Sequence, residues 1–387
     1  MNHRLLEQVH AEHTRALKLV EDLDDSAWRQ QYHPDLSPLG WHIGHLLFIE
    51  TYWLREVVLG DNRLTDSLKP LYFPWLSPKP QRARRLPDKD ELGLQAQALH
   101  KENLEWLAEL LLKGSGHALL RDNYLLHFLI QHYCQHIETM HQILLLRALQ
   151  TPGGDAQVNR PLSSRPPVQP ELQFDAAPTH IGNTDHAATY DNELPRHEVV
   201  LGQYRLAAVP VSNAEYLGFI EANGYTTRKY WSETGWRWAR GQGITAPLHW
   251  RRDHKGDWGD GASANGAADL DPAAAVDGIS HHEAAAFARY AQCRLPTEAE
   301  WEHAMNCRTG LFDSTGQAWE WCGNAFYPYP GFRAFPYDGY SKPWFDGAHF
   351  SLRGGSRFTS PQIRRPSFRN FYTADKRHIF AGLRLAL

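Results

Sequence analysis

Residues 37–60 read SPLGWHIGHLLFIETYWLREVVLG. The stretch is predominantly apolar, and it opens with Ser37 and Pro38, a pair typical of a helix start with serine as the N-cap and proline at the first helical position. It ends at Gly60, a residue type that commonly follows a helix. The stretch therefore predicts an apolar helix that carries two histidines three residues apart, His42 and His45.

Three further helices are expected around this one. Residues 3–23 carry apolar side chains at helical spacing, and residues 88–113 and 117–149 show similar patterns. A proline-rich loop over 69–87 separates the second helix from the third. Four helices with one long crossover loop predict an all-α four-helix bundle over residues 1–150.

The chain changes character after the bundle. Residues 151–172 have the composition of a linker. Glycine, proline and aromatic residues then dominate residues 173–387, with short strand-like pieces and two clear helices over 212–223 and 280–292. This half is expected to be an irregular α+β domain, and its segment 250–277 to be a flexible loop of undetermined role.

Bulk composition limits the possible partners. The 387 residues are 42% hydrophobic and 22% charged, with a net charge of -4, which points neither to nucleic acid nor to an anionic membrane. No apolar run approaches the roughly 18 residues needed to cross a membrane. The four cysteines show no zinc-knuckle spacing and no disulfide framework. We expect a cytoplasmic protein.

His132 and His136 are the strongest metal-binding signal. Residues at i and i+4 share one helix face, so both imidazoles can reach one metal ion. His141 lies about 180° around the helix from His132, so a third ligand must come from another helix, which offers His42 or His45. Three neutral histidines would suit Zn, Fe or Cu alike, while a pair of bystander histidines is the alternative.

The segment SPLGWHIGHLLFIETYWL resembles the second helix of the DinB-like bundle in ergothioneine-type sulfoxide synthases. The family motif is roughly Ser-Pro-x-x-Trp-x-x-x-His, whose last histidine binds iron, and that position here is His45. The fourth helix of the family carries His-x-x-Gln-His-x-Glu, which is matched by His132, Gln135, His136 and Glu138.

The C-terminal half resembles the formylglycine-generating-enzyme fold, which is related to C-type lectins. Its tryptophans Trp301, Trp319 and Trp321 are expected to be core residues. The matching motifs are CRLPTEAEWEHA (293–304), AWEWC (318–322), YPYPGF (327–332), LRGGS (352–356), RPSFRNF (365–371) and IFAGLRLAL (379–387).

The resemblance implies a nonheme Fe(II) enzyme that uses O2 to join a sulfur or selenium donor to the imidazole carbon of hercynine, Nα-trimethylhistidine. Three neutral ligands would leave about three positions for the two substrates and O2. Gln135 and Asn370 match hercynine contacts, and Phe371 offers a cation–π face to the trimethylammonium group. The family also uses a tyrosine as proton donor, which here is one of Tyr329, Tyr337 and Tyr340.

The donor pocket departs from the family pattern. Enzymes that use γ-glutamylcysteine place Asp and Arg where this chain has Tyr372 and Lys376. The family's arginine loop is replaced by a segment with Arg82, Arg84 and Arg85, which serve either as substrate contacts or as solvated surface. Because a neutral sugar needs no such charges, the chain most resembles selenoneine synthase, which uses 1-seleno-glucose.

Three alternatives stay open at this stage. The first is a sulfoxide synthase that takes γ-glutamylcysteine or cysteine. The second, a formylglycine-generating enzyme, is disfavoured because no cysteine follows the Gly-Gly-Ser motif at 354–356. The third is a non-catalytic module that binds a metal or a small molecule.

Overall fold

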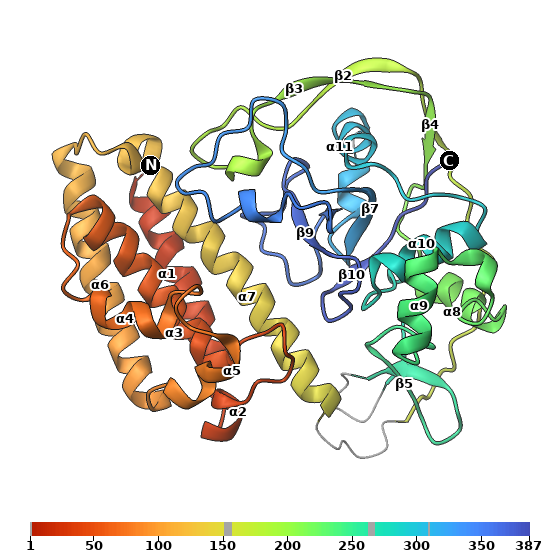
Figure 1. Ribbon diagram of the computed structural model, residues 1–387, viewed down its shortest axis with the longest axis horizontal. Coiled ribbons are helices and arrows are strands. Elements are labelled where there is room, and N and C mark those ends of the chain that lie inside the picture. The colour runs from red at the N-terminus through yellow and green to blue at the C-terminus, as the bar shows by residue number, and fades with distance from the viewer. Residues whose placement is uncertain (1, 151–156, 262–267, 309) are drawn as a thin grey trace. The chain divides into compact units, whose positions relative to one another are not determined.

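The computed structural model describes residues 2–150, 157–261, 268–308 and 310–387. The chain forms two compact units (Figure 1). We name them the helical unit, residues 1–150 with 185–189, and the C-terminal unit, residues 151–184 with 190–387. Within the described residues, no helix has both the length and the apolar character that a membrane span requires.

Four long helices build the helical unit. They are α1 (Asn2–Lys18), α3 (Leu39–Thr51) with its π-helical continuation η1 (Tyr52–Val58), α6 (Lys89–Lys113) and α7 (Tyr124–Gln150). Short helices connect them: α2 (Asp25–Arg29), α4 (Thr65–Tyr72), α5 (Lys79–Arg82), η2 (Ala83–Arg85) and η3 (Ala118–Asn123).

The directions of the helices follow from their side-chain contacts. Helix α3 runs parallel to α6 and antiparallel to α7, because residue numbers rise together in the first pair and oppositely in the second. The contacts are Glu50–His100, Arg55–Trp106, His42–His136 and Trp53–Phe128. The parallel pair requires a crossover between α3 and α6, and the segment with α4 and α5 provides it.

Helix α3 is enclosed by its neighbours, and every residue from Leu39 to Thr51 is buried. Two glycines allow the closest approaches. A Cβ placed on Gly44 would lie 2.0 Å from the ring of Tyr72, and one on Gly40 would lie 2.4 Å from Trp28. The helix therefore packs at distances that no larger residue allows.

The expected start of this helix is wrong by one residue. Pro38 is the N-cap, and no side chain caps the first turn. The hydroxyl of Ser37 instead accepts a hydrogen bond from the Arg82 guanidinium. Ser37 therefore anchors the crossover segment and does not cap the helix.

The C-terminal unit is centred on a four-stranded sheet with the order β10-β7-β8-β9. Three two-stranded sheets accompany it, β1 with β4, β2 with β3, and β5 with β6. The strands are β1 (Leu172–Phe174), β2 (Ala177–Ile181), β3 (His197–Leu201), β4 (Tyr204–Leu206), β5 (Trp250–Arg252), β6 (Trp258–Asp260), β7 (Trp319–Ala325), β8 (His349–Arg353), β9 (Asn370–Thr373) and β10 (Ala381–Gly382).

Along the chain, helices and 3-10 turns alternate with the strands of the C-terminal unit. The α-helices are α8 (Asn213–Glu221), α9 (Glu233–Gly241), α10 (His281–Tyr290) and α11 (Glu298–Cys307), and the 3-10 turns are η4 (Asp191–Glu193), η5 (Arg228–Tyr230), η6 (Phe312–Ser314) and η7 (Lys342–Trp344). Ser212 and Ser280 cap α8 and α10 with capping boxes, which explains why the expected helices begin there.

The expectation of a flexible loop over 250–277 is wrong for its first part. Residues 250–260 form the β5/β6 hairpin, in which Trp250 pairs with Asp260. Residues 262–267 lie outside the described residues, as do residues 151–156 of the expected linker. The described remainder of that linker is anchored in the C-terminal unit, because the backbone N–H of Val168 donates to Glu215 of α8.

The core of the C-terminal unit combines tryptophans with buried ion pairs. Trp301, Trp319 and Trp321 are 0%, 2% and 0% exposed, which confirms their expected role. Three buried arginines each meet a buried glutamate, and the pairs are Arg353–Glu302 (2.8 Å), Arg369–Glu298 (2.8 Å) and Arg384–Glu320 (2.7 Å).

Candidate metal centre

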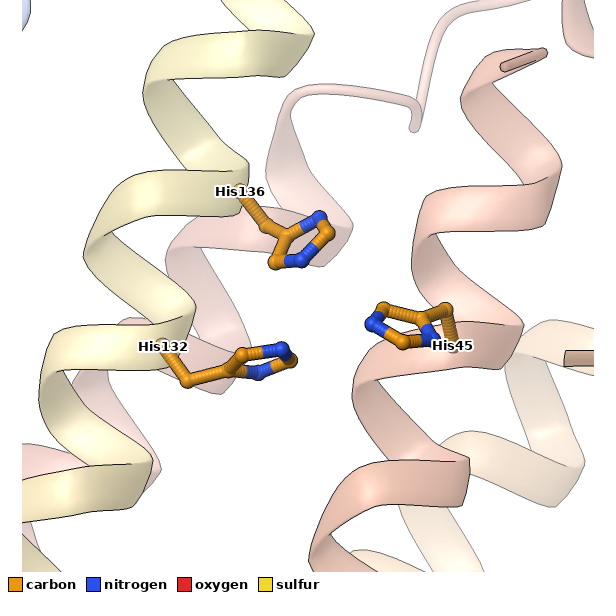
Figure 2. Close-up of side chains that lie close together, drawn as sticks. All are labelled: His45, His132 and His136. Carbon is orange, nitrogen blue, oxygen red and sulfur yellow. The ribbon is translucent and has the colours of Figure 1, made fainter. Parts of the chain in front are cut away.

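Three histidines from two facing helices converge inside the helical unit (Figure 2). His132 and His136 project from successive turns of α7, and His45 projects from α3 toward them. One ring nitrogen from each lies within 4.8 Å of the other two. Among the described residues, this cluster includes no carboxylate.

The ring spacing fits a shared metal ion. The ring centres are 4.5 Å apart for His132 and His136, 4.7 Å for His45 and His136, and 5.2 Å for His45 and His132. Imidazoles bound about 2.1 Å from one metal, at angles of about 90–110° to each other, would have centres about 4.5–5.3 Å apart. The three rings are thus arranged as ligands of a divalent transition metal would be.

His45 is held in the orientation that a ligand requires. Its Nδ1–H donates to the backbone carbonyl of Tyr72 at 2.8 Å, which leaves Nε2 with a free lone pair. Tyr72 reaches this position because its ring packs directly against Gly44, the residue before His45. The glycine in the sequence motif therefore helps to orient the histidine.

All three rings are kept neutral. Burial lowers the pKa of His45 to about 4, although the bond to Tyr72 opposes this shift. Burial also lowers the pKa of His132 and His136 well below the usual value, and the neighbouring histidines add to the effect. Neutral imidazole is the form that binds metal.

His42 is the neighbour that the sequence interpretation set aside. It is 3% exposed, and its Nδ1 lies 2.8 Å from Nδ1 of His136. His42 does not belong to the three-histidine cluster, and neither does His141. The available signal was the i, i+3 spacing of His42 and His45, which places both rings on the side of α3 that faces α7.

Arg82 lies behind His45, and its interpretation as solvated surface is wrong. Its guanidinium stacks on Trp41 at 3.7 Å, and Trp41 stacks on His45 with ring centres 4.6 Å apart. Arg82 is 5% exposed and donates to the carbonyl oxygen of Ser77 at 2.8 Å. Arg84 and Arg85, in contrast, are exposed.

The three candidate tyrosines differ in their surroundings. Tyr329 is buried, and its hydroxyl accepts a hydrogen bond from Arg353 at 2.9 Å. Tyr340 stacks on Tyr190 with ring centres 4.2 Å apart. Tyr337 is 39% exposed.

The expected substrate contacts other than the three arginines lie on strand β9 or shortly after it, apart from Gln135, which is half-buried on α7. Asn370 accepts a hydrogen bond from the backbone N–H of Phe371. Phe371 stacks on Phe326 at 4.3 Å between ring centres. Tyr372 is half-buried, and Lys376 pairs with the adjacent Asp375 at 3.2 Å.

Family models match both units. The DinB superfamily model matches residues 8–140, and the model of the sulfatase-modifying factor enzyme 1-like domain matches residues 167–309 and 306–387. The expected fold is therefore confirmed, a helical DinB domain followed by an α+β domain of the sulfatase-modifying-factor type.

Curated relatives align along nearly the whole chain. A hercynine oxygenase of Mycolicibacterium thermoresistibile is 32% identical over 430 residues, which cover 96% of this chain and 92% of the relative. A hercynine oxygenase of Mycobacterium tuberculosis is 32% identical, with 96% of each chain covered. Ergothioneine biosynthesis protein 1 of Schizosaccharomyces pombe is 26% identical over 93% of this chain and 52% of its own length. The chain belongs to the family of the hercynine oxygenases and ergothioneine biosynthesis proteins.

Proposed function

We propose that this chain is an iron- and O2-dependent enzyme that joins a chalcogen donor to the imidazole carbon of hercynine. The observation that carries the proposal is the convergence of three neutral imidazoles, from His45, His132 and His136, without a carboxylate. The names of the hercynine oxygenases support the acceptor. Fe(II) in such a site would supply the redox chemistry and keep positions open for both substrates and O2.

The chain's own residues bind and orient the acceptor in this proposal. Gln135 follows His132 by three residues on α7, and so it lies next to the ligands. Asn370 and Phe371 complete the proposed hercynine contacts, with the phenyl ring facing the fixed positive charge. The proton donor in this proposal is one of Tyr329, Tyr337 and Tyr340, and the hydroxyl of Tyr329 accepts a hydrogen bond from Arg353.

We further propose that the donor is a selenosugar, 1-seleno-glucose. The zwitterionic end of γ-glutamylcysteine needs an acidic and a basic partner, and a buried ammonium without a carboxylate is costly. Tyr372 provides no charge, and Lys376 is already paired with Asp375. A lysine is also a point charge, whereas arginine grips a carboxylate with two parallel hydrogen bonds.

The experiment is a competition with the full chain, Fe(II), O2 and hercynine. Equal concentrations of 1-seleno-glucose, γ-glutamylcysteine and cysteine are supplied, and the products are separated by mass. The selenosugar adduct should dominate. A dominant γ-glutamylcysteine or cysteine adduct would instead identify a sulfoxide synthase, and no adduct from any donor would favour a non-catalytic binding module.

A paired variant tests the donor residues directly. Replacing Tyr372→Asp and Lys376→Arg together restores the acidic and basic partners of the peptide, so selectivity should move toward γ-glutamylcysteine. Tyr372→Phe with Lys376→Arg is the matched control, because it adds the arginine without the carboxylate. An unchanged preference in the first variant would show that these positions do not contact the donor.

A further inference from the structure

We infer that His42 is a positioning residue for the proposed metal ligand His136, and that it fixes which nitrogen of His136 faces the metal. The inference rests on the proposed metal site and concerns a residue outside the ligand set. Its basis is a single short contact, the 2.8 Å separation between Nδ1 of His42 and Nδ1 of His136.

The contact is set by the packing of two helices. His42 and His45 lie three residues apart on α3, so both side chains point to α7. Because α3 and α7 are antiparallel, the first histidine of α3, His42, contacts the second histidine of the α7 pair, His136. His45 lies near both His132 and His136. His42 is 3% exposed, so water does not compete freely for its ring.

The hydrogen bond between these two imidazole nitrogens uses one proton, which either ring can donate, and the donor determines which nitrogen of His136 is left for a metal. If Nδ1 of His136 carries the proton and donates, Nε2 of His136 keeps a lone pair for the metal. If His42 donates instead, the proton of His136 sits on Nε2 and blocks that lone pair. Metal binding therefore selects the state in which His42 accepts through Nδ1 and carries its own proton on Nε2.

The second nitrogen of His42 makes no competing contact. Nε2 of His42 is buried and has no hydrogen-bond partner among the described residues. The same holds for Nε2 of His13, so an unpaired nitrogen does not by itself distinguish a positioning histidine from a structural one. What distinguishes His42 is its contact with Nδ1 of His136, a proposed metal ligand.

In the proposed metal-bound state, His45 and His136 are oriented in the same way by different partners. The carbonyl of Tyr72 accepts from Nδ1–H of His45, and Nδ1 of His42 would accept from Nδ1–H of His136 across their 2.8 Å contact. A backbone carbonyl can only accept, so His45 has its tautomer fixed by the main chain. The tautomer of His136 depends on a side chain, which makes it open to mutation.

The test is a Co(II) titration of the full chain, with affinity measured by chelator competition and coordination followed by the visible absorption bands. His42→Asn keeps an acceptor, because Oδ1 of asparagine occupies the place of histidine Nδ1. His42→Leu removes the acceptor at similar volume. His13→Leu is the matched control, a buried histidine of the same unit outside the cluster, and His132→Ala removes a proposed ligand.

We expect His42→Leu to raise the Kd for Co(II) by about 10- to 100-fold and to change the absorption bands, with His42→Asn and His13→Leu within about threefold of the wild type. A wild-type Kd and spectrum in His42→Leu would overturn the inference, and so would equal loss in His42→Asn and His42→Leu. If the wild type bound no Co(II), or if His132→Ala bound it as tightly, the metal site itself would fail and the inference with it.

Discussion

Two polar clusters of this chain, one in each unit, hold their groups in different chemical states. The C-terminal unit buries full charges in pairs, and Arg384 and Glu320 are both 0% exposed and joined by two hydrogen bonds of 2.7 and 2.8 Å. The cluster in the helical unit holds the neutral rings of His45, His132 and His136, and one nitrogen of each lies within 4.8 Å of the other two. In the first cluster the charges are paired within the protein, whereas the second has the ring spacing that a bound metal ion would fit.

This difference suggests that the buried ion pairs stabilise the fold, whereas the histidine cluster is available to bind a ligand. A buried charge with its partner holds loops together and has little capacity left for a ligand. A buried neutral imidazole with one nitrogen hydrogen-bonded and the other directed at its neighbours is prepared for a metal. Substitutions in the two places should therefore damage different properties, stability in one unit and metal binding in the other.

The largest effect is expected from His132→Ala. Removing a ligand should lower bound iron and turnover by more than about 100-fold, beyond the 10- to 100-fold typical of outer partners. Thermal stability of the metal-free protein should change little, because the ring lies at a site and not in a satisfied network. Iron content and product formation measure the effect, with His141→Ala as the control on the same helix. Metal loss in His141→Ala alone would show that the ligand set is wrong.

The opposite pattern is expected from Arg384→Met in the C-terminal unit. It leaves the carboxylate of Glu320 buried without its arginine partner, while Nε1–H of Trp301 still donates to it. Breaking one side of a buried pair costs about 3–5 kcal/mol of unfolding free energy. Urea unfolding measures the loss, and the Co(II) affinity of the folded fraction should stay unchanged. The double variant Arg384→Met with Glu320→Leu should recover part of the stability, and failure to do so would argue against the buried charge as the cause.

Gly44→Ala should affect both properties, because Gly44 supports the orientation of His45. The new Cβ would lie 2.0 Å from the Tyr72 ring, so the ring and its backbone must move. Overpacking of this kind costs about 1–3 kcal/mol. The Tyr72 carbonyl would also leave Nδ1 of His45, which should weaken metal binding. Gly93→Ala on α6 is the control, because nothing lies within 4 Å of a Cβ there. Equal metal affinity in Gly44→Ala and Gly93→Ala would contradict the role of Tyr72.

The smallest effect is expected from Phe371→Leu. Loss of a cation–π contact is worth about 0.5–2 kcal/mol, which corresponds to a rise of about 2- to 30-fold in KM for hercynine. Metal content should be unaffected, and stability should fall by about 0.5–1.5 kcal/mol, because the stacking of Phe371 on Phe326 is lost. Phe371→Trp should retain the affinity. A KM that is unchanged in Phe371→Leu would remove this residue from the proposed acceptor site.

The three-histidine cluster could be largely predicted from the sequence, because helix periodicity is a local rule. The i, i+4 spacing of His132 and His136 and the histidines of α3 were visible without tertiary information. The hydrogen bond between His42 and His136 could not be predicted, because it depends on the antiparallel packing of α3 on α7. The burial of Arg82 was missed for the same reason, since only the crossover segment brings it onto Trp41.

In the C-terminal unit, the tryptophans Trp301, Trp319 and Trp321 were predictable as core residues from their large apolar surface. Their charged neighbours were not. The sequence around three glutamates has the polar composition of an exposed helix or strand. Their burial is explained by arginine partners from distant segments, and the glutamates are Glu298, Glu302 and Glu320. The β5/β6 hairpin was missed because its sequence is rich in charge and glycine, a composition typical of loops.

The central claim is that His45, His132 and His136 hold one metal ion. Anomalous diffraction from crystals of the Fe(II)-loaded chain, collected at the iron edge, tests it most directly. We predict one strong iron peak at about 2.1 Å from a ring nitrogen of each of the three histidines, with His42 bonded to His136 and not to the iron. A peak coordinated by other residues, or the absence of iron from this cluster in a protein that binds iron elsewhere, would contradict the account.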